Sequence, residues 1–536
     1  MTTTIPPPKA TAREWIGLAV LALACLLYVM DLTVLHLAVP ALSADLRPTS
    51  SQLLWIIDIY GFLVAGSLIT MGTLGDRIGR RKLLMIGAAF FGAVSLLAAF
   101  SVNAEMLILA RALLGIAGAT LAPSTLSLIF HMFGDERQRR VAIGVWIGSF
   151  SAGSAMGPLL GGIVLELFWW GSVFLLALPV MAALLILGPR VLPEYRDPDA
   201  GRLDLVSAGL SIAAILAVIY GAKELAVAGL VPPSVMSILA GLAIGLVFVR
   251  RQSRLADPMI DVSLFRIPTF NAALATNFLS IFVVVGYFLF VAQYLQLVVG
   301  LSPLEAGLWS LPSATAFVVV SQLTPRIVGR VQPAQLIGFG LLVAAAGLLM
   351  LVQAGAVDGL AILVAASVVI SLGMAPVFGL TTELVVGSAP PERAGAASGI
   401  SQTGAELGGA LGIAILGSIG VAVYRDSLGD WLTTPVPAGV LAAARDTLGG
   451  AVAASAELPY ATGAALRAAA REAFVAGMHL TALIAAIVAT GLAAMALFVL
   501  RSRDMPSSSE DEVVPSFTSP PEQVAPMSPS QLERAD

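Results

Sequence analysis

Residues 72–82 read Gly-Thr-Leu-Gly-Asp-Arg-Ile-Gly-Arg-Arg-Lys, and they separate two long apolar runs of the chain. Basic residues concentrate at the end of this segment, and short cytoplasmic loops of membrane proteins carry such an excess of Lys and Arg. Asp76 can pair with Arg77 or Arg80 while it faces a helix N-terminus. We therefore expect a cytoplasmic turn between two membrane-spanning helices.

The composition of the whole chain also indicates a membrane protein. Of its 536 residues, 58% are hydrophobic and 12% are charged, against roughly 25% charged in soluble domains. The mean hydropathy is +0.93. Because surface area grows too slowly with chain length, a soluble fold cannot bury so much apolar area. The greater part of the chain is therefore expected to lie in lipid.

Charge and residue types exclude several classes of protein. The net charge of −4 argues against a nucleic-acid partner, which requires a basic face. One cysteine, Cys25, excludes a disulfide framework, and the three histidines lie far apart, so no metal site is expected. The sequence contains no phosphate-binding loop, nucleophile elbow or dinucleotide fingerprint. We expect no cofactor and no enzymatic activity.

Apolar windows of about 20 residues, the length that crosses a bilayer, predict fourteen membrane-spanning helices. They lie at 14–40, 51–72, 83–101, 104–131, 140–165, 169–189, 204–221, 233–250, 269–299, 303–323, 335–353, 358–385, 398–422 and 473–500. The two at 204–221 and 233–250 are the weakest, and Lys223 with Glu224 is interpreted as part of the loop between them. With both termini in the cytoplasm, most basic residues fall on the cytoplasmic side.

Three segments are not expected to span the membrane. Residues 1–13 form a short tail without a signal-peptide cleavage pattern, and 504–536, rich in Ser, Pro and acidic residues, are expected to be disordered. Residues 423–472 predict a long outer loop with short helices at 437–456 and 460–472, a helical hairpin. This loop is interpreted either as a packing cap on the outer mouth or as a gating element.

Few charged side chains fall within the predicted spans, and each costs at least ~2.5–3.5 kcal/mol at the bilayer centre. They are Asp31, Asp58, Arg111 and Glu406. Three carboxylates on three helices predict a polar cavity that exchanges protons or, when ionised, holds a cation. Arg111 stays charged, and its candidate partner is Asp31. The alternatives are structural hydrogen bonds for the carboxylates and a permanent ion pair for Arg111.

Candidate substrate contacts lie within about one turn of Asp31, Asp58 or Glu406, or on an aromatic stripe of the span 269–299. They are Tyr28, Trp55, Asp58, Tyr60, Tyr287, Phe290, Tyr294, Gln402 and Glu406. Aromatic faces attract organic cations, so this set predicts a site for lipophilic cations. The alternative for the stripe is packing against lipid or against the protein core.

Several motifs resemble signatures of the major facilitator superfamily. The segment 72–82 matches the loop signature G-x-L-x-D-R-x-G-R-[RK] at every specified position. The resemblance implies a cytoplasmic gate formed by Gly72, Asp76, Arg77, Gly79 and Arg80. Leu107-x-x-x-Arg111-x-x-x-Gly115 resembles the signature of the fourth helix. Gly153-x-x-x-Gly157-Pro158-x-x-Gly161-Gly162 resembles the antiporter signature of the fifth, in which glycines permit close helix packing.

Two further motifs resemble those of the fourteen-helix drug:proton antiporters. Asp31-x-Thr33-Val34-x-x-x-Ala38-x-Pro40 is similar to their first-helix signature, with His36 where Asn is usual. We interpret His36 as a neutral hydrogen-bonding substitute rather than a second proton carrier. Glu406-Leu-Gly-Gly-Ala-Leu-Gly-Ile-Ala resembles helix 13 of the quaternary-ammonium multidrug exporters.

The resemblance spans residues 14–500 and implies an all-α polytopic major facilitator fold. Six-helix bundles are expected at 14–190 and 269–503, with two extra helices in the linker 191–268. The implied protein is a monomeric, proton-coupled antiporter of the bacterial cytoplasmic membrane, driven by the proton-motive force. It would export hydrophobic, mainly cationic drugs, dyes or quaternary ammonium compounds by alternating access.

Within this interpretation, proton coupling is assigned to Asp31, Arg111, Asp58 and Glu406. Asp31 is expected to take the main proton role, while Asp58 and Glu406 face each other across the cavity and hold the substrate cation. One alternative is an antiporter dedicated to a single natural product or lipid. Another is an uptake symporter, which the fifth-helix signature disfavours. A membrane enzyme or sensor lacks any supporting motif.

Overall fold

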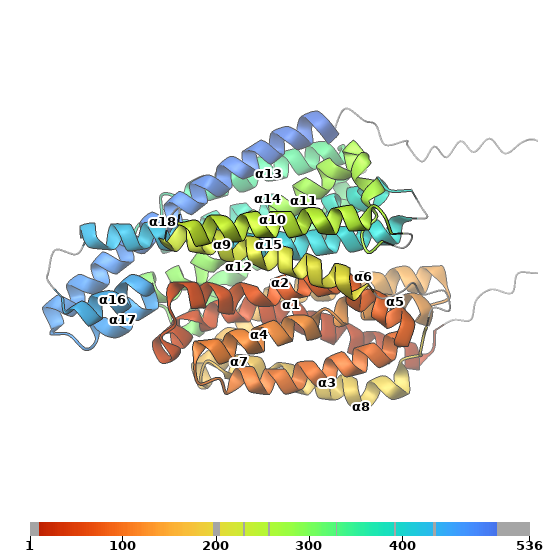
Figure 1. The fold of residues 1–536 in the computed structure, drawn as a ribbon, viewed down its shortest axis with the longest axis horizontal. Helices are drawn as coiled ribbons and strands as arrows, with labels where there is room; N and C mark the ends of the chain where they lie inside the picture. Colours follow the sequence, from red (N-terminus) through yellow and green to blue (C-terminus); the bar gives the residue numbers. More distant parts are fainter. Residues whose placement is uncertain are drawn as a thin grey trace, which may run out of the picture. The chain divides into compact units, whose positions relative to one another are not determined.

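Long apolar helices account for most of the chain in a computed structural model. The model describes residues 10–196, 204–228, 231–255, 258–328, 330–390, 393–431 and 436–500. Within these ranges the chain is helical and contains no β-strand (Figure 1). Thirteen of the described helices are long and apolar enough to cross a membrane, and a shorter apolar segment lies at Met156–Leu167. The all-α polytopic fold is confirmed. The predicted tail 504–536 and most of 1–13 lie outside the described residues.

The N-terminal half begins with two helices that side chains cap. At the start of α1 (Ala12–Leu46), the Thr11 side chain accepts a backbone hydrogen bond while Glu14 accepts one from the Thr11 N–H, a capping box. Thr49 and Gln52 form the same arrangement at α2 (Ser50–Ile78). The half continues with α3 (Arg80–Ala99), α4 (Ala104–Gly118), α5 (Leu121–Met132), α6 (Glu136–Leu167), α7 (Ser172–Leu175) and α8 (Ala177–Val191). α4 with α5, and α7 with α8, each form one membrane span.

The C-terminal half contains the remaining long helices. They are α11 (Pro268–Gln293) with the π-helical turn η2 (Tyr294–Val299), α12 (Pro303–Val328), α13 (Pro333–Leu351), α14 (Leu360–Gly387), α15 (Ala394–Trp431) and α18 (Tyr460–Met495) with η4 (Ala496–Leu500). Several begin at proline, which suits the first turn because its missing N–H would be unpaired there. Buried apolar side chains of both halves join in one large cluster.

Two helices between the halves form a hairpin. They are α9 (Leu205–Ala228) and α10 (Pro232–Gln252), which pack closely where glycines leave room. A Cβ on Gly221 would lie 2.6 Å from the Ser234 carbonyl oxygen. α9 also contacts α2 and α15, one helix from each half, through an apolar cluster that includes Ile219, Phe62 and Ala410. It therefore covers the junction of the two halves on this side (Figure 1).

The bounds of α9 correct one prediction. Lys223, expected in the loop after the seventh span, lies inside α9 and is buried. The apolar window ended at this charge, but the backbone continues as a helix to Ala228. The reason is that the Lys223 ammonium finds a carboxylate partner on another helix, so the charge does not have to leave the membrane.

The long outer segment also differs from its prediction. The helix α15 extends past the predicted end at 422, and 437–456 divides into α16 (Ala438–Asp446) and α17 (Leu448–Ser455). Residues 460–472 are the first turns of α18 rather than a separate helix, because no proline interrupts this Ala-rich stretch before the predicted span begins. α17 contacts α1 and α18, so it bridges the two halves. We call this end of the molecule the cap end, and the opposite end, with Gly79, the basic end.

Candidate substrate and proton site

Arg111 and Asp31 form a buried ion pair between α4 and α1. Arg111 Nη1 lies 2.5 Å from Asp31 Oδ2, and Arg111 Nε donates a hydrogen bond of 3.2 Å to the Ile56 carbonyl. The guanidinium carbon lies 4.6 Å from the centre of the Tyr60 ring. Arg111 is only 1% exposed. The predicted partnership is present, and it compensates a charge that would be costly to bury alone.

Asp58 has a cationic partner that the sequence analysis missed. Nζ of Lys223 lies 2.8 Å from Asp58 Oδ2 and 3.0 Å from Oδ1, and both side chains are buried. The same Nζ lies 3.8 Å from the centre of the Trp55 ring. The signal that could have found Lys223 is a Lys, followed by Glu224, within an apolar run that continues to Ala228, because a charge in the membrane requires a partner.

This pair gives Asp58 a partner other than the predicted one, and its role in substrate binding stays a prediction. The sequence predicts that Asp58 and Glu406 face each other with a substrate cation between them. In this structure the Asp58 carboxylate is neutralised by Lys223 instead. Asp58 is therefore not an unoccupied cation site in this conformation.

Glu406 joins the two halves of the molecule. The hydroxyl of Tyr28 on α1 donates a hydrogen bond of 2.5 Å to Glu406 Oε1 on α15. Among the residues that the structure describes, no Lys or Arg forms an ion pair with Glu406. Of the three carboxylates, Glu406 is therefore the one whose charge no described cation balances. Gln402, one turn earlier on α15, is half-buried.

Aromatic rings connect Glu406 to the Arg111–Asp31 pair. The rings of Tyr28 and Tyr60 lie 6.2 Å apart, and Tyr60 in turn packs on the Arg111 guanidinium. The Tyr60 hydroxyl is buried and has no hydrogen-bond partner in the described part of the chain. Tyr28 and Asp31 lie one turn apart on α1, so both ends of this chain of contacts share a helix.

The aromatic stripe of α11 packs within the C-terminal half. Tyr287 hydrogen-bonds Ser367 of α14, and the Tyr294 hydroxyl donates to the Gly355 carbonyl. The Phe290 ring lies 5.9 Å from that of Phe474. Tyr287 and Phe290 line a narrow cavity with side chains of α13, α15 and α18. None of the described contacts of the stripe is with Asp31, Asp58 or Glu406, so its role in substrate binding stays a prediction.

The segment 72–82 is almost entirely helical, which corrects the expected loop. α2 continues to Ile78 and α3 begins at Arg80, so Gly79 alone separates them. Gly79 has φ +112°, a conformation that residues with a Cβ rarely adopt. Arg80 donates to Asp76 Oδ1 from Nε at 2.7 Å and approaches it with Nη2 at 2.6 Å. Of the two predicted partners of Asp76, the structure shows Arg80, while Arg77 is exposed.

The segment after α8 closes over this turn, which the sequence analysis did not predict. Glu194 accepts a hydrogen bond of 3.0 Å from the Arg81 N–H, and the Arg80 N–H donates to the Tyr195 carbonyl at 2.9 Å. A Cβ on Gly79 would lie 2.5 Å from Glu194 Oε1. The end of the sixth span is therefore attached to the turn between α2 and α3. Gly72 has ordinary packing against Pro123.

The glycine motif of α6 faces two different helices. Gly153, Gly157 and Gly161 pack on the part of α1 that carries Asp31. Gly162 instead packs on α12 of the other half, where an added Cβ would lie 2.7 Å from the Pro303 carbonyl oxygen. Pro158 lies beside Gly307 of α12. The motif thus positions the helix of Asp31 and also forms part of the contact between the two halves.

Polar contacts between the two halves lie in the middle and at the cap end, as far as the structure describes them. Gln296 donates to the Leu37 carbonyl at 3.0 Å. Arg425 donates to Ser50 at 3.0 Å and pairs with Asp446 at 3.1 Å. With Tyr28 and Glu406, these contacts join the halves from the centre to the cap end.

Thirteen spanning helices and one shorter apolar segment in the described part of the chain, arranged as two halves joined by a hairpin and enclosing buried ion pairs, are typical of a secondary transporter. The sequence profile of the Major Facilitator Superfamily matches residues 21–413, and the chain belongs to this family. It is a multi-pass protein of the bacterial cytoplasmic membrane.

The chain is similar to known efflux and resistance proteins. It is 44% identical over 491 residues to the "Multidrug efflux pump LfrA" of Mycolicibacterium smegmatis, and the aligned region covers 91% of this chain and 96% of the relative. It is 37% identical over 487 residues to the "Methyl viologen resistance protein SmvA" of Salmonella typhimurium, covering 86% and 93%. Its fold resembles that of an inward-facing bacterial homolog of the human lysosomal transporter Spinster, with a TM-score of 0.66 and 18% sequence identity. The match covers 93% of this chain and 100% of that chain.

Proposed function

We propose that this protein exports hydrophobic, mainly cationic drugs, dyes or quaternary ammonium compounds in exchange for protons. The observation that carries the proposal is the position of Glu406, a carboxylate between the two halves with no cationic partner among the described residues. Ionised, it can hold a lipophilic cation; protonated, it loses that attraction. One group that takes either a proton or a substrate couples the two fluxes by competition.

The conformational cycle follows from where the halves touch. We place the basic end in the cytoplasm, because short cytoplasmic loops are rich in Lys and Arg. Substrate reaches Glu406 from this side while the contacts at the cap end hold the halves together. Rocking of the halves then separates Tyr28 from Glu406 and opens the cap end, as in the alternating access of transporters with a midplane site.

The other charged groups have supporting roles. Asp31 takes the main proton role, with release controlled by its distance from Arg111. Asp76 and Arg80 bias the conformational equilibrium at the basic end. The proton-motive force is the energy source, no cofactor is needed, and the monomer is the working unit. The names of the relatives support this proposal: one is a multidrug efflux pump, and the other confers resistance to methyl viologen, a dication.

Efflux from proteoliposomes under an imposed pH gradient tests the proposal. We expect wild-type protein to move ethidium against its gradient and Glu406→Gln protein to lose this activity. Glu383→Gln is the matched control, because Glu383 is an exposed glutamate of α14. An ATP requirement, or no flux at any gradient, would overturn the proposal. Transport of one compound only would favour the alternative of a dedicated antiporter.

A further inference from the structure

Lys223 occupies a position with the chemistry of an organic-cation site. Its ammonium lies between the Asp58 carboxylate, at 2.8 and 3.0 Å, and the face of the Trp55 ring, at 3.8 Å from the ring centre. A carboxylate beside an aromatic face is the arrangement that binds ammonium compounds out of water. The site is complete, and in this structure a side chain of the protein fills it.

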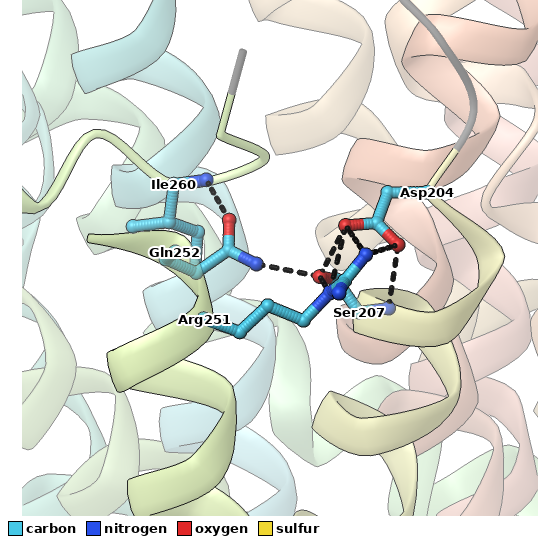
Figure 2. Close-up of polar contacts among 5 residues, drawn as sticks. All are labelled: Asp204, Ser207, Arg251, Gln252 and Ile260. Carbon is cyan, nitrogen blue, oxygen red and sulfur yellow. Dashed lines mark hydrogen bonds and ion pairs between the residues drawn. The ribbon is translucent and has the colours of Figure 1, made fainter. Parts of the chain in front are cut away.

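The helix that carries Lys223 is also held by contacts other than this ion pair. At the basic end, Asp204 before α9 holds Arg251 of α10 with nitrogen–oxygen distances of 3.0 to 3.2 Å (Figure 2). Gln252 donates to Ser207 at 2.7 Å and accepts from the Ile260 N–H at 3.3 Å (Figure 2). These contacts fix the hairpin to itself and to the linker, and the apolar packing of Ile219 with Phe62 and Ala410 holds α9 on α2 and α15. The Lys223 side chain can therefore leave Asp58 while α9 stays in place.

The balance of charges shows what such a movement would change. The central carboxylates are Asp31, Asp58 and Glu406, and the central cations are Arg111 and Lys223. When both ion pairs are formed, Glu406 is the one of these three carboxylates whose negative charge has no counter-charge. The site can then accept one positive charge from a substrate. When the flexible four-carbon side chain of Lys223 turns away, the negative charge of Asp58 also loses its counter-charge. The site can then accept two positive charges.

We propose that Lys223 is a built-in cation that competes with substrate for the Asp58–Trp55 site and so sets the charge preference of the transporter. This inference rests on the proposed function, because it requires that cationic compounds bind beside Glu406. A dication enters by displacing Lys223, with one charge at Glu406 and the other at Asp58. A monocation binds at Glu406 and leaves Lys223 in place.

Equilibrium binding to the purified full chain tests the competition. The probes are methyl viologen as dication, tetraphenylphosphonium as monocation and a neutral dye. Lys223→Met keeps the length of the stem and removes the charge. We expect it to bind methyl viologen about tenfold more tightly or better, since removing a like charge from a contact is worth at least this factor. The affinity for tetraphenylphosphonium should rise less, and the affinity for the neutral dye should not change.

A second variant shows whether the gain acts through Asp58. The double variant D58N/K223M removes both members of the pair, so the gain of K223M should disappear. Equal affinities of K223M and wild type for all three probes would overturn the competition. A gain that persists in D58N/K223M would also overturn it, because the freed carboxylate is then not the cause.

K223M leaves Asp58 unpaired and can therefore fold poorly. A further variant, for which the opposite result is expected, tests the proposal in that case. Lys223→Arg retains the charge and can bind the carboxylate in a bidentate way, so it should be harder to displace. We expect methyl viologen to bind several-fold more weakly and tetraphenylphosphonium to bind as before. Unchanged affinity for methyl viologen would count against the proposal. If wild-type protein binds neither cation, the proposed function itself fails; if it binds both and E406Q does not, only the role of Lys223 is in question.

Discussion

The Tyr28 hydroxyl donates a hydrogen bond of 2.5 Å to Glu406 Oε1, and this bond joins α1 of one half to α15 of the other. Rocking that moves α1 away from α15 lengthens it, since its partners lie on opposite sides of the junction. A hydrogen bond to an ionised carboxylate is roughly twice as strong as one between neutral groups. We infer that taking up a proton or a cation at Glu406 weakens the contact and eases the movement of the halves.

The charge of Glu406 should decide which compounds bind. A cation at ~4 Å from a carboxylate gains on the order of 4 kcal/mol at an effective dielectric constant near 20, before desolvation is deducted. Glu406→Gln should therefore weaken dications most, monocations by about tenfold, and neutral dyes least. Binding of a matched set of divalent, monovalent and neutral compounds measures this. A loss of equal size for all three classes would show that Glu406 acts through folding instead of charge.

Removal of the Arg111 charge should stop coupled transport. Arg111→Ala leaves Asp31 buried without its partner, which costs roughly 3–5 kcal/mol. The first measurement is the melting temperature and monodispersity of the variant. The second is efflux driven by a pH gradient, which should be lost in R111A and in Asp31→Asn, while D31N still binds some cations.

The double variant D31N/R111A separates stability from coupling. It removes both charges, so its melting temperature should recover toward that of wild type while coupled efflux stays absent. Normal proton-driven efflux from well-folded R111A protein would show that the ion pair has no role in coupling.

Asp76 should act on turnover rather than on affinity. Its partner is Arg80 at the basic end, and it touches no described residue of the central site. Asp76→Asn should reduce efflux strongly and keep substrate affinity within a few fold, because it changes the balance of conformations. Arg80→Gln should have the same effect, since it breaks the same pair. If binding falls as much as transport in these variants, the pair supports the site itself.

Gly162 should be intolerant of side chains. A Cβ there would lie 2.7 Å from the backbone oxygen of Pro303 and 3.0 Å from Leu304 Cα, and backbone cannot yield as a flexible side chain does. Gly162→Val should separate α6 from α12 and disfavour the conformation that is joined at the cap end. Gly148→Val is the control on the same helix, because a Cβ at Gly148 meets nothing within 4 Å. Equal efflux from the two variants would contradict the prediction.

Asp204 should stabilise the α9–α10 hairpin over a wide range of pH. Burial raises the pKa of Asp204, but hydrogen bonds from Arg251 and Ser207 outweigh it and lower the pKa from 3.8 to about 2. A carboxyl group whose pKa is lower in the folded than in the unfolded state stabilises the fold at pH values above its unfolded-state pKa. This stabilisation is lost as the pH falls through the folded-state pKa. Asp204→Asn should thus cost about 1 kcal/mol at neutral pH, a modest value because Arg251 is partly exposed.

Thermal unfolding at several pH values checks this expectation. The difference in melting temperature between wild type and D204N should be constant at neutral pH and narrow between about pH 4 and pH 2. The control is Glu383→Gln, in which an exposed carboxylate of α14 is removed. A difference that disappears already near pH 6 would point to another group.

The sequence by itself determined the features that depend on local patterns. Apolar runs of sufficient length gave helix positions within a few residues for most spans, because a bilayer sets the length of a crossing helix. The cost of a charge in lipid identified Asp31, Asp58, Arg111 and Glu406, and it also predicted that Arg111 pairs with Asp31. Local glycine spacing identified the close packing of α6.

Only the tertiary structure decided which partners Asp58 and Glu406 meet. Lys223 and Asp58 are 165 positions apart, and no local pattern indicates that α9 packs on α2. The same holds for Tyr28 and Glu406, which are 378 positions apart. Ion pairing depends on distance in space, so the order of the helices around the centre determines which carboxylates are balanced. That order leaves Glu406 without a described cation, because the cations of α4 and α9 lie beside Asp31 and Asp58 instead.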